Sequence, residues 1–165
     1  MKKILFILTA LAIMITMCSC EKREPEVQPD PGEIMREIAV QYPECKNTVY
    51  ESGNIIKELT YAKAARIYSG GKNKPADMSK IEKYSVAADP DTEVGIFKLY
   101  DRGSADYVKR MAQTRISKMR TGGINLAAII ANNAEARSYG NYVYYVSHPE
   151  KDKIFEIIED MLRGV

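Results

Sequence analysis

The sequence predicts an α+β fold: a small, mainly antiparallel sheet packed on one face by a long middle helix and a C-terminal helix. Two apolar segments, 81–88 and 93–100, flank an Asp-Pro-Asp turn and predict a hairpin that precedes a long helical pattern. A second pair, 136–139 and 142–147, precedes an amphipathic C-terminal segment. Hairpins that alternate with helices in this way are typical of α+β layers.

The first helix is expected to begin at Pro31. Asp30 suits the N-cap, and Glu33 stands where it would complete a capping box, while Pro43 ends the pattern. The apolar residues recur at four-residue spacing, namely Ile34, Ile38 and Tyr42. A short strand at 48–50, a helix at 58–68 and a loop at 70–77 follow.

Ser104 is expected to cap the long middle helix, which ends at the glycine pair 122–123. Its apolar stripe comprises Val108, Met111, Ala112, Ile116 and Met119. A short helix at 126–131 and a turn at 140–141 come next, and Pro149 opens the last helix. The expected buried side of this helix comprises Ile154, Ile157, Ile158, Met161 and Leu162.

The N-terminus has the pattern of a bacterial lipoprotein signal peptide. Lys2 and Lys3 precede an apolar run, and a small residue, Ser19, stands directly before Cys20. The run is shorter than the roughly 20 residues that a membrane-spanning helix needs. We expect a signal peptide at 1–19, lipidation of Cys20 by fatty acyl chains and a tether through Asp30. Cleavage elsewhere, or modification of Cys18, is the alternative.

Removing the first 19 of the 165 residues takes away Lys2 and Lys3, and 22 basic residues then face 22 acidic ones. A neutral chain is not expected to have a nucleic acid as its main partner. Residues 31–165 are long enough for one domain. Cys45 has no partner for a disulfide if Cys20 carries lipid, and we expect it to be a buried apolar residue.

One stretch of the chain resembles a known family. The segment EVGIFK at 93–98, a long charged helix, and GNYV at 140–143 leading into a strand and an amphipathic helix are similar to small lipoproteins of clostridia-type Gram-positive bacteria with domain of unknown function 4358. The likeness spans Ile34 to Leu162 and implies a fold and an envelope location. It implies no activity. The basic middle helix departs from the acidic balance expected of that family.

Residues with catalytic or metal-binding chemistry are sparse. His148 is the only histidine, stands before a predicted helix start and is expected to cap it or lie at the surface. Asp89, Asp91 and Glu93 resemble the start of a calcium loop, but Val94 and Tyr100 occupy the places of its glycine and glutamate. We therefore expect no catalytic residues, no metal and no cofactor.

Two surfaces are candidates for binding. The middle helix carries a set of basic residues that could face anionic lipids or wall polymers, although a solvated helix face is the simpler interpretation. They are Lys109, Arg110, Arg115, Lys118 and Arg120. In the last hairpin, Tyr142 and Tyr144 point to one side and Tyr145 to the other, and an exposed row of tyrosines could bind a glycan or a partner strand. Tyrosines that cover the wetter face of a sheet are the simpler interpretation here.

These features predict a lipid-anchored protein on the extracytoplasmic face of the cell membrane. Its expected role is that of a non-catalytic module that docks an envelope protein or a cell-wall polymer. Two alternatives stay open: a small cell-envelope hydrolase, and an accessory solute-binding lipoprotein of a transporter. A deep polar pocket would favour either alternative. The sequence indicates neither the oligomeric state nor the identity of a partner.

Overall fold

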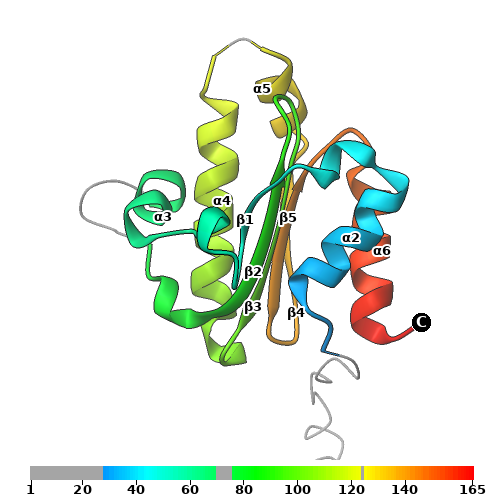
Figure 1. Cartoon of the computed structure of the whole chain (residues 1–165). Helices are drawn as coiled ribbons and strands as arrows, with labels where there is room; N and C mark the ends of the chain where they lie inside the picture. Colours follow the sequence, from blue (N-terminus) through cyan, green and yellow to red (C-terminus); the bar gives the residue numbers. More distant parts are fainter. Residues whose placement is uncertain (1–27, 70–75, 124) are drawn as a thin grey trace, which may run out of the picture.

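The structure is a computed structural model that describes residues 28–69, 76–123 and 125–165. Its centre is an antiparallel sheet of five strands in the order β1-β2-β3-β5-β4 (Figure 1). The strands are β1 (Thr48–Glu51), β2 (Ile81–Ala88), β3 (Glu93–Leu99), β4 (Glu135–Tyr139) and β5 (Tyr142–Ser147). The α+β class and the antiparallel sheet are confirmed, and both predicted hairpins form.

Five α-helices surround the sheet in the described residues. They are α2 (Pro31–Gln41), α3 (Tyr61–Tyr68), α4 (Ala105–Arg120), α5 (Leu126–Ala131) and α6 (Lys151–Arg163). Short 3-10 turns, η1 (Pro43–Lys46), η2 (Ile55–Lys57), η3 (Met78–Lys80) and η4 (Arg102–Ser104), join them. The expected loop at 70–77 lies mostly outside the described residues.

Helix starts follow the predicted capping chemistry at α2 but differ elsewhere, and α6 begins at Lys151 instead of at Pro149. Asp30 and Glu33 form the capping box at α2. Ser104 makes no side-chain cap, because its hydroxyl donates instead to Asp101 at 2.8 Å. The helix expected at 58–68 begins later, because the Thr60 hydroxyl accepts the N–H of Lys63 and caps it there.

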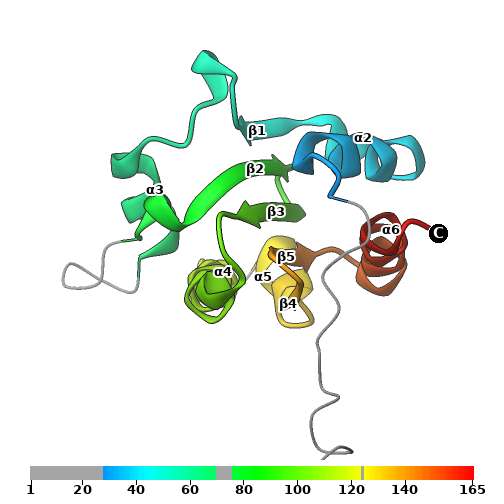
Figure 2. The same ribbon diagram turned by 90° about the horizontal axis from the view of Figure 1, so that it is seen from below.

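The helices cover both faces of the sheet, so the prediction that α4 and α6 share one face is wrong. Seen from below, α3 and α4 lie on one side and α2 and α6 on the other (Figure 2). β3 and β5 are apolar on both faces because both faces are covered: Phe97 and Tyr145 meet α4, whereas Ile96 and Tyr144 meet α6.

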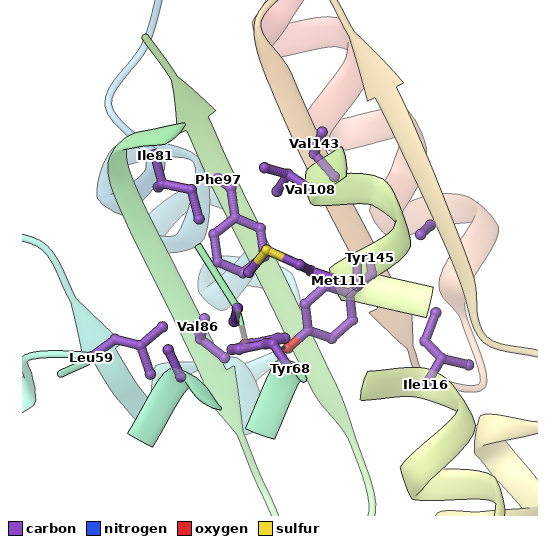
Figure 3. Close-up of a cluster of buried hydrophobic side chains, with 14 of the residues drawn as sticks. Leu59, Tyr68, Ile81, Val86, Phe97, Val108, Met111, Ile116, Val143 and Tyr145 are labelled. Atoms are coloured by element: carbon purple, nitrogen blue, oxygen red, sulfur yellow. Dashed lines mark hydrogen bonds between the residues drawn. The ribbon is translucent and has the colours of Figure 1, made fainter. Parts of the chain in front are cut away.

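Two hydrophobic cores result, one on each face. The α4 core gathers Tyr68, Phe97, Val108, Met111, Ile116 and Tyr145 (Figure 3). The second core gathers Ile34, Ile38, Ile96, Tyr144, Ile154, Phe155 and Ile158. Cys45 is buried beside the second core, as predicted. No described helix is long and apolar enough to cross a membrane.

Candidate functional site

Tyr142 and Tyr144 do not form an exposed row, and the prediction of a tyrosine binding face is wrong. Both are buried under α2 and α6, with 0% and 1% of their surface exposed. The Tyr142 hydroxyl donates to the Pro29 carbonyl at 2.7 Å, and the Tyr144 hydroxyl donates to Glu159 at 3.3 Å. Burial raises the pKa of each phenol. These tyrosines hold the sheet to its helices.

The basic residues of α4 divide into engaged and free groups. The Lys118 ammonium donates to the Arg66 carbonyl at 2.8 Å, and Arg120 donates to three carbonyls of the segment 131–134. Lys109 and Arg110 make no ion pair with a described residue, and Arg110 is exposed. Lys109 and Arg110 are therefore the two basic side chains that no described residue holds in place, whereas Lys118 and Arg120 are held by carbonyls and keep their positive charge.

The fifth basic residue, Arg115, belongs to a buried polar network that the sequence did not predict. Its guanidinium binds the Glu93 carboxylate through Nε at 2.9 Å and through Nη2. The Tyr145 hydroxyl also donates to Glu93, so the Tyr68 hydroxyl, 2.9 Å away, donates to Tyr145. The network thus connects α3, β5, β3 and α4.

The charges within this network are balanced. The Glu93 side chain is 7% exposed and that of Arg115 is 28% exposed. The hydrogen bond to Glu93 is the main cause that raises the pKa of Arg115. Burial first, and then the charge of Glu93, raise the pKa of Tyr145 and of Tyr68. Both phenols therefore stay neutral and serve as hydrogen-bond donors.

Two clefts flank β1, one on each face of the sheet. The cleft on the α2 side, here the α2 cleft, has a volume of about 460 Å³. It is lined by Gly32, Met35, Arg36, Ala39, Val40, Cys45, Lys46, Thr48 and Glu51. The cleft on the α3 side, here the α3 cleft, has a volume of about 380 Å³. It is lined by Val49, Tyr50, Arg66, Ile67, Tyr68, Val86, Ala88, Glu93 and Arg115.

The polar network forms part of the wall of the α3 cleft, because Tyr68, Glu93 and Arg115 all line it. Arg115 uses Nε and Nη2 on Glu93, while Nη1 makes no hydrogen bond with a described residue. Arg66 is exposed at the same cleft and forms no ion pair with a described residue. The α3 cleft therefore offers donors to an anionic group.

His148 has a structural position. It is buried, with 6% of its surface exposed, so the predicted surface position is wrong. Its Nδ1 accepts the N–H of Glu150, the N-cap residue of α6, at 3.0 Å, but no side chain caps the first turn of that helix, so the predicted capping role is wrong as well. Because Nδ1 accepts, Nε2 carries the ring proton and donates to Glu44 at 2.8 Å. This hydrogen bond is the main cause that lowers the pKa of Glu44. Neither ring nitrogen is left to act as a base.

The remaining candidate catalytic and metal-binding residues are also unsuited to those roles. Burial raises the pKa of the Cys45 thiol to about 11, and the nearby Glu44 and Asp89 add to this shift. The thiolate that a nucleophile requires is therefore scarce at neutral pH. Asp89 accepts from Asn47 at 3.1 Å, and Glu93 points into the buried network instead of a calcium loop. Among the described residues, no three His, Cys, Asp or Glu side chains gather in a metal-binding group.

No family model, no curated protein and no solved structure matches the chain. The resemblance to the lipoproteins with domain of unknown function 4358 stays a prediction. Cys20 lies outside the described residues, and its lipidation stays a prediction as well.

Proposed function

We propose that this protein is a lipid-anchored, extracytoplasmic module that docks another envelope protein without catalysing a reaction. The lipobox pattern that ends at Cys20 supports the anchor and the location. The observation that carries the docking role is the contrast between the two edges of the sheet. One edge is closed by charged side chains, and the other is open and flanked by clefts.

The closed edge is β4. Arg137 of β4 pairs with Glu135 at 3.0 Å and with Glu159 of α6 at 3.1 Å, and its guanidinium lies 3.9 Å from the centre of the Phe155 ring. Charged side chains on an edge strand disfavour pairing with another chain. The open edge is β1, whose Val49 is 38% exposed. An unpaired edge with a pocket on each face is suited to binding a protein segment.

The histidine and the buried cysteine are not available as catalytic groups, which favours a binding role over hydrolysis. His148 uses both ring nitrogens, and the Cys45 thiol is buried with a raised pKa. Nucleophilic catalysis needs a nucleophile within reach of a base that can take its proton. Neither residue meets that requirement.

Membrane fractionation tests the anchor. In cells given radiolabelled palmitate, the full-length protein should carry label and sediment with membranes, and Cys20→Ala should lose both properties. Cys45→Ala is the matched control, because it removes a buried cysteine of the domain and should leave labelling unchanged. Label in the Cys20→Ala protein would show that the lipid is attached elsewhere.

Site-specific photocrosslinking in intact cells tests the docking role. A photoreactive amino acid at Val49, on the open edge, should give a discrete crosslinked product with one envelope protein. The same amino acid at Glu156, an exposed position of α6, is the control and should not give that product. Identical products from both positions, or none from Val49, would contradict docking at β1.

A further inference from the structure

The open edge of the sheet is suited to one type of partner, and this inference rests on the proposed docking function. We propose that β1 binds an extended peptide segment as an added sixth strand, with alternating apolar and acidic side chains. The apolar side chains enter the α2 cleft, and the acidic ones enter the α3 cleft.

The sheet leaves one side of the β1 backbone without a partner strand. β1 pairs with β2 alone, and the register passes from Thr48↔Ala87 to Tyr50↔Val86. Val49 is therefore the extra residue of a bulge and has no partner in the β2 ladder. Four residues of strand span about 13 Å, which is enough for a short added strand. Backbone hydrogen bonds along such an edge give affinity without regard to side chains.

The positions of the clefts match the alternation of an added strand. Successive side chains of a strand point to opposite faces of the sheet. Thr48 and Glu51 line the α2 cleft, whereas Val49 and Tyr50 line the α3 cleft, so the two clefts lie on opposite faces of the same edge. A segment beside β1 would therefore place every second side chain in one cleft and the others in the other cleft.

The lining of each cleft determines what it accepts. Met35, Ala39 and Val40 give the α2 cleft an apolar part, and Val40 is 73% exposed there. The charged residues that line the same cleft are Arg36, Lys46 and Glu51. The α3 cleft instead presents Arg66 and the Nη1 of Arg115, which makes no hydrogen bond within the described part of the chain. A carboxylate can accept from both guanidinium groups in the charge-assisted geometry that arginine favours.

The net charge of the edge excludes a second copy as the preferred occupant. Because Glu93 and Arg115 compensate each other, the other charged residues of the two clefts are Arg36, Lys46 and Arg66, against Glu51 alone. Pairing of two β1 edges would bring together two surfaces that each carry an excess of positive charge, and these would repel each other. A segment with acidic side chains complements it.

Fluorescence anisotropy with synthetic peptides tests the proposal. The protein is the full chain in detergent micelles, and the probe is a labelled eight-residue peptide of alternating glutamate and valine. We expect saturable binding of this peptide. The affinity should fall by about tenfold or more when lysine replaces glutamate. Equal binding of the two peptides, or no binding of the glutamate peptide, would overturn the proposal.

Backbone methylation separates strand addition from a purely electrostatic contact. In an extended segment, the N–H groups of alternate residues point to the same edge. One probe is N-methylated at every glutamate and a second at every valine. Strand addition predicts that one methylated probe loses binding and the other keeps it, because only one edge of the segment faces β1. If both bind or both fail, the segment does not pair with β1.

Two protein variants test whether the acidic side chains of the peptide bind in the α3 cleft. Arg66→Glu reverses an exposed charge of the α3 cleft and should weaken binding of the glutamate peptide about tenfold. Lys80→Glu reverses an exposed charge outside both clefts and should leave binding unchanged. An equal loss in the two variants would indicate attraction by overall charge and overturn the assignment. A chain that dimerises in sedimentation and ignores every peptide would identify a second copy as the occupant.

Discussion

Gly95 lies directly opposite Tyr145 in the pairing of β3 with β5, and the Tyr145 ring occupies the space that a side chain at position 95 would fill. A Cβ atom at Gly95 would stand 2.2 Å from Cε1 of that ring. This glycine lets the ring lie across β3, where its hydroxyl can reach both Glu93 and Tyr68. The buried network therefore depends on a missing side chain.

Gly95→Ala should destabilise the protein by about 1 to 3 kcal/mol, because a fully buried ring would have to move. Urea denaturation followed by circular dichroism measures the loss. The cost should fall when Tyr145→Val is present, since the smaller side chain frees the space. Additive losses in this double-mutant cycle would show that the ring is not the obstacle.

Glu93→Gln should cost about 2 kcal/mol of stability, because it leaves the Arg115 charge and the Tyr145 hydroxyl with a weaker acceptor. The value is below that of a fully buried pair since Arg115 is partly exposed. Glu82→Gln is the matched control: Glu82 pairs with Lys98 at 3.5 Å near the surface and should cost under about 1 kcal/mol. Equal losses in urea denaturation would contradict a special role for Glu93.

The contrast between Tyr144 and Tyr145 shows how far the sequence could predict this fold. Alternation along β5 correctly placed the two side chains on opposite faces. It could not show that both faces are covered, because an all-buried strand and a half-exposed strand with tyrosines look alike in sequence. The placement of α4 and α6 on one face failed for the same reason. Helical periodicity identifies an apolar stripe and not the face of the sheet that it meets.

The candidate site was still less predictable. Glu93 and Arg115 are far apart in the chain, and a glutamate at the start of a strand usually indicates an exposed end. The only local signal was Gly95, whose position in an apolar strand indicates close approach by another group. The two clefts depend on where α2 and α3 meet β1. No spacing within one segment encodes that arrangement.

The last helix offers a direct comparison of neighbouring positions. The sequence predicted both Ile157 and Ile158 on the buried side of α6, but Ile158 is fully buried and Ile157 only partly. Ile158→Ala should cost about 2 to 5 kcal/mol, and Ile157→Ala should cost less than half of that. Chemical denaturation of both variants measures the difference. A larger loss at Ile157 would mean that α6 is rotated from its position here.

The cap of α2 should make stability depend on pH. The Asp30 carboxylate accepts the Gly32 N–H at 2.9 Å and pairs with Lys83 at 2.7 Å. Burial alone would raise the pKa of Asp30, but the Lys83 and Gly32 hydrogen bonds and the nearby positive charges lower it below its ordinary value of 3.8. A lowered pKa in the folded state stabilises the fold above the unfolded value, and this contribution is lost as the pH falls through the folded pKa.

Asp30→Asn keeps the cap and removes the charge, so it separates these two effects. Its stability deficit should be constant above about pH 5 and should shrink as the pH falls through the ordinary value and then through the lowered folded pKa, below which the wild-type carboxyl is also protonated. Asp30→Ala should in addition lose about 0.5 to 2 kcal/mol of capping energy at every pH. Urea denaturation from pH 3 to 7 measures both. A pH-independent deficit for Asp30→Asn would show that the Lys83 pair contributes nothing.

The basic residues of α4 set the expected strength of any contact with anionic lipid. Lys109 and Arg110 are the members of the basic set without a described partner, and each basic group near an anionic surface contributes about 1 kcal/mol. Two such groups are too few for stable attachment at physiological salt. A chain without residues 1–19 and with Cys20→Ala should sediment weakly with anionic vesicles at low salt. This binding should disappear as salt shortens the screening length to about 8 Å.

Variants on α4 determine whether that weak binding is local. Lys109→Gln with Arg110→Gln should cause the largest loss of low-salt sedimentation, because these two side chains are free to reach the vesicle surface. Lys118→Gln should cause a smaller loss, since the Lys118 ammonium keeps its charge but is held at the Arg66 carbonyl. Zwitterionic vesicles give the baseline. Strong sedimentation at physiological salt, or an equal loss with Lys118→Gln, would show that the whole helix face meets the membrane, as the sequence alone had allowed.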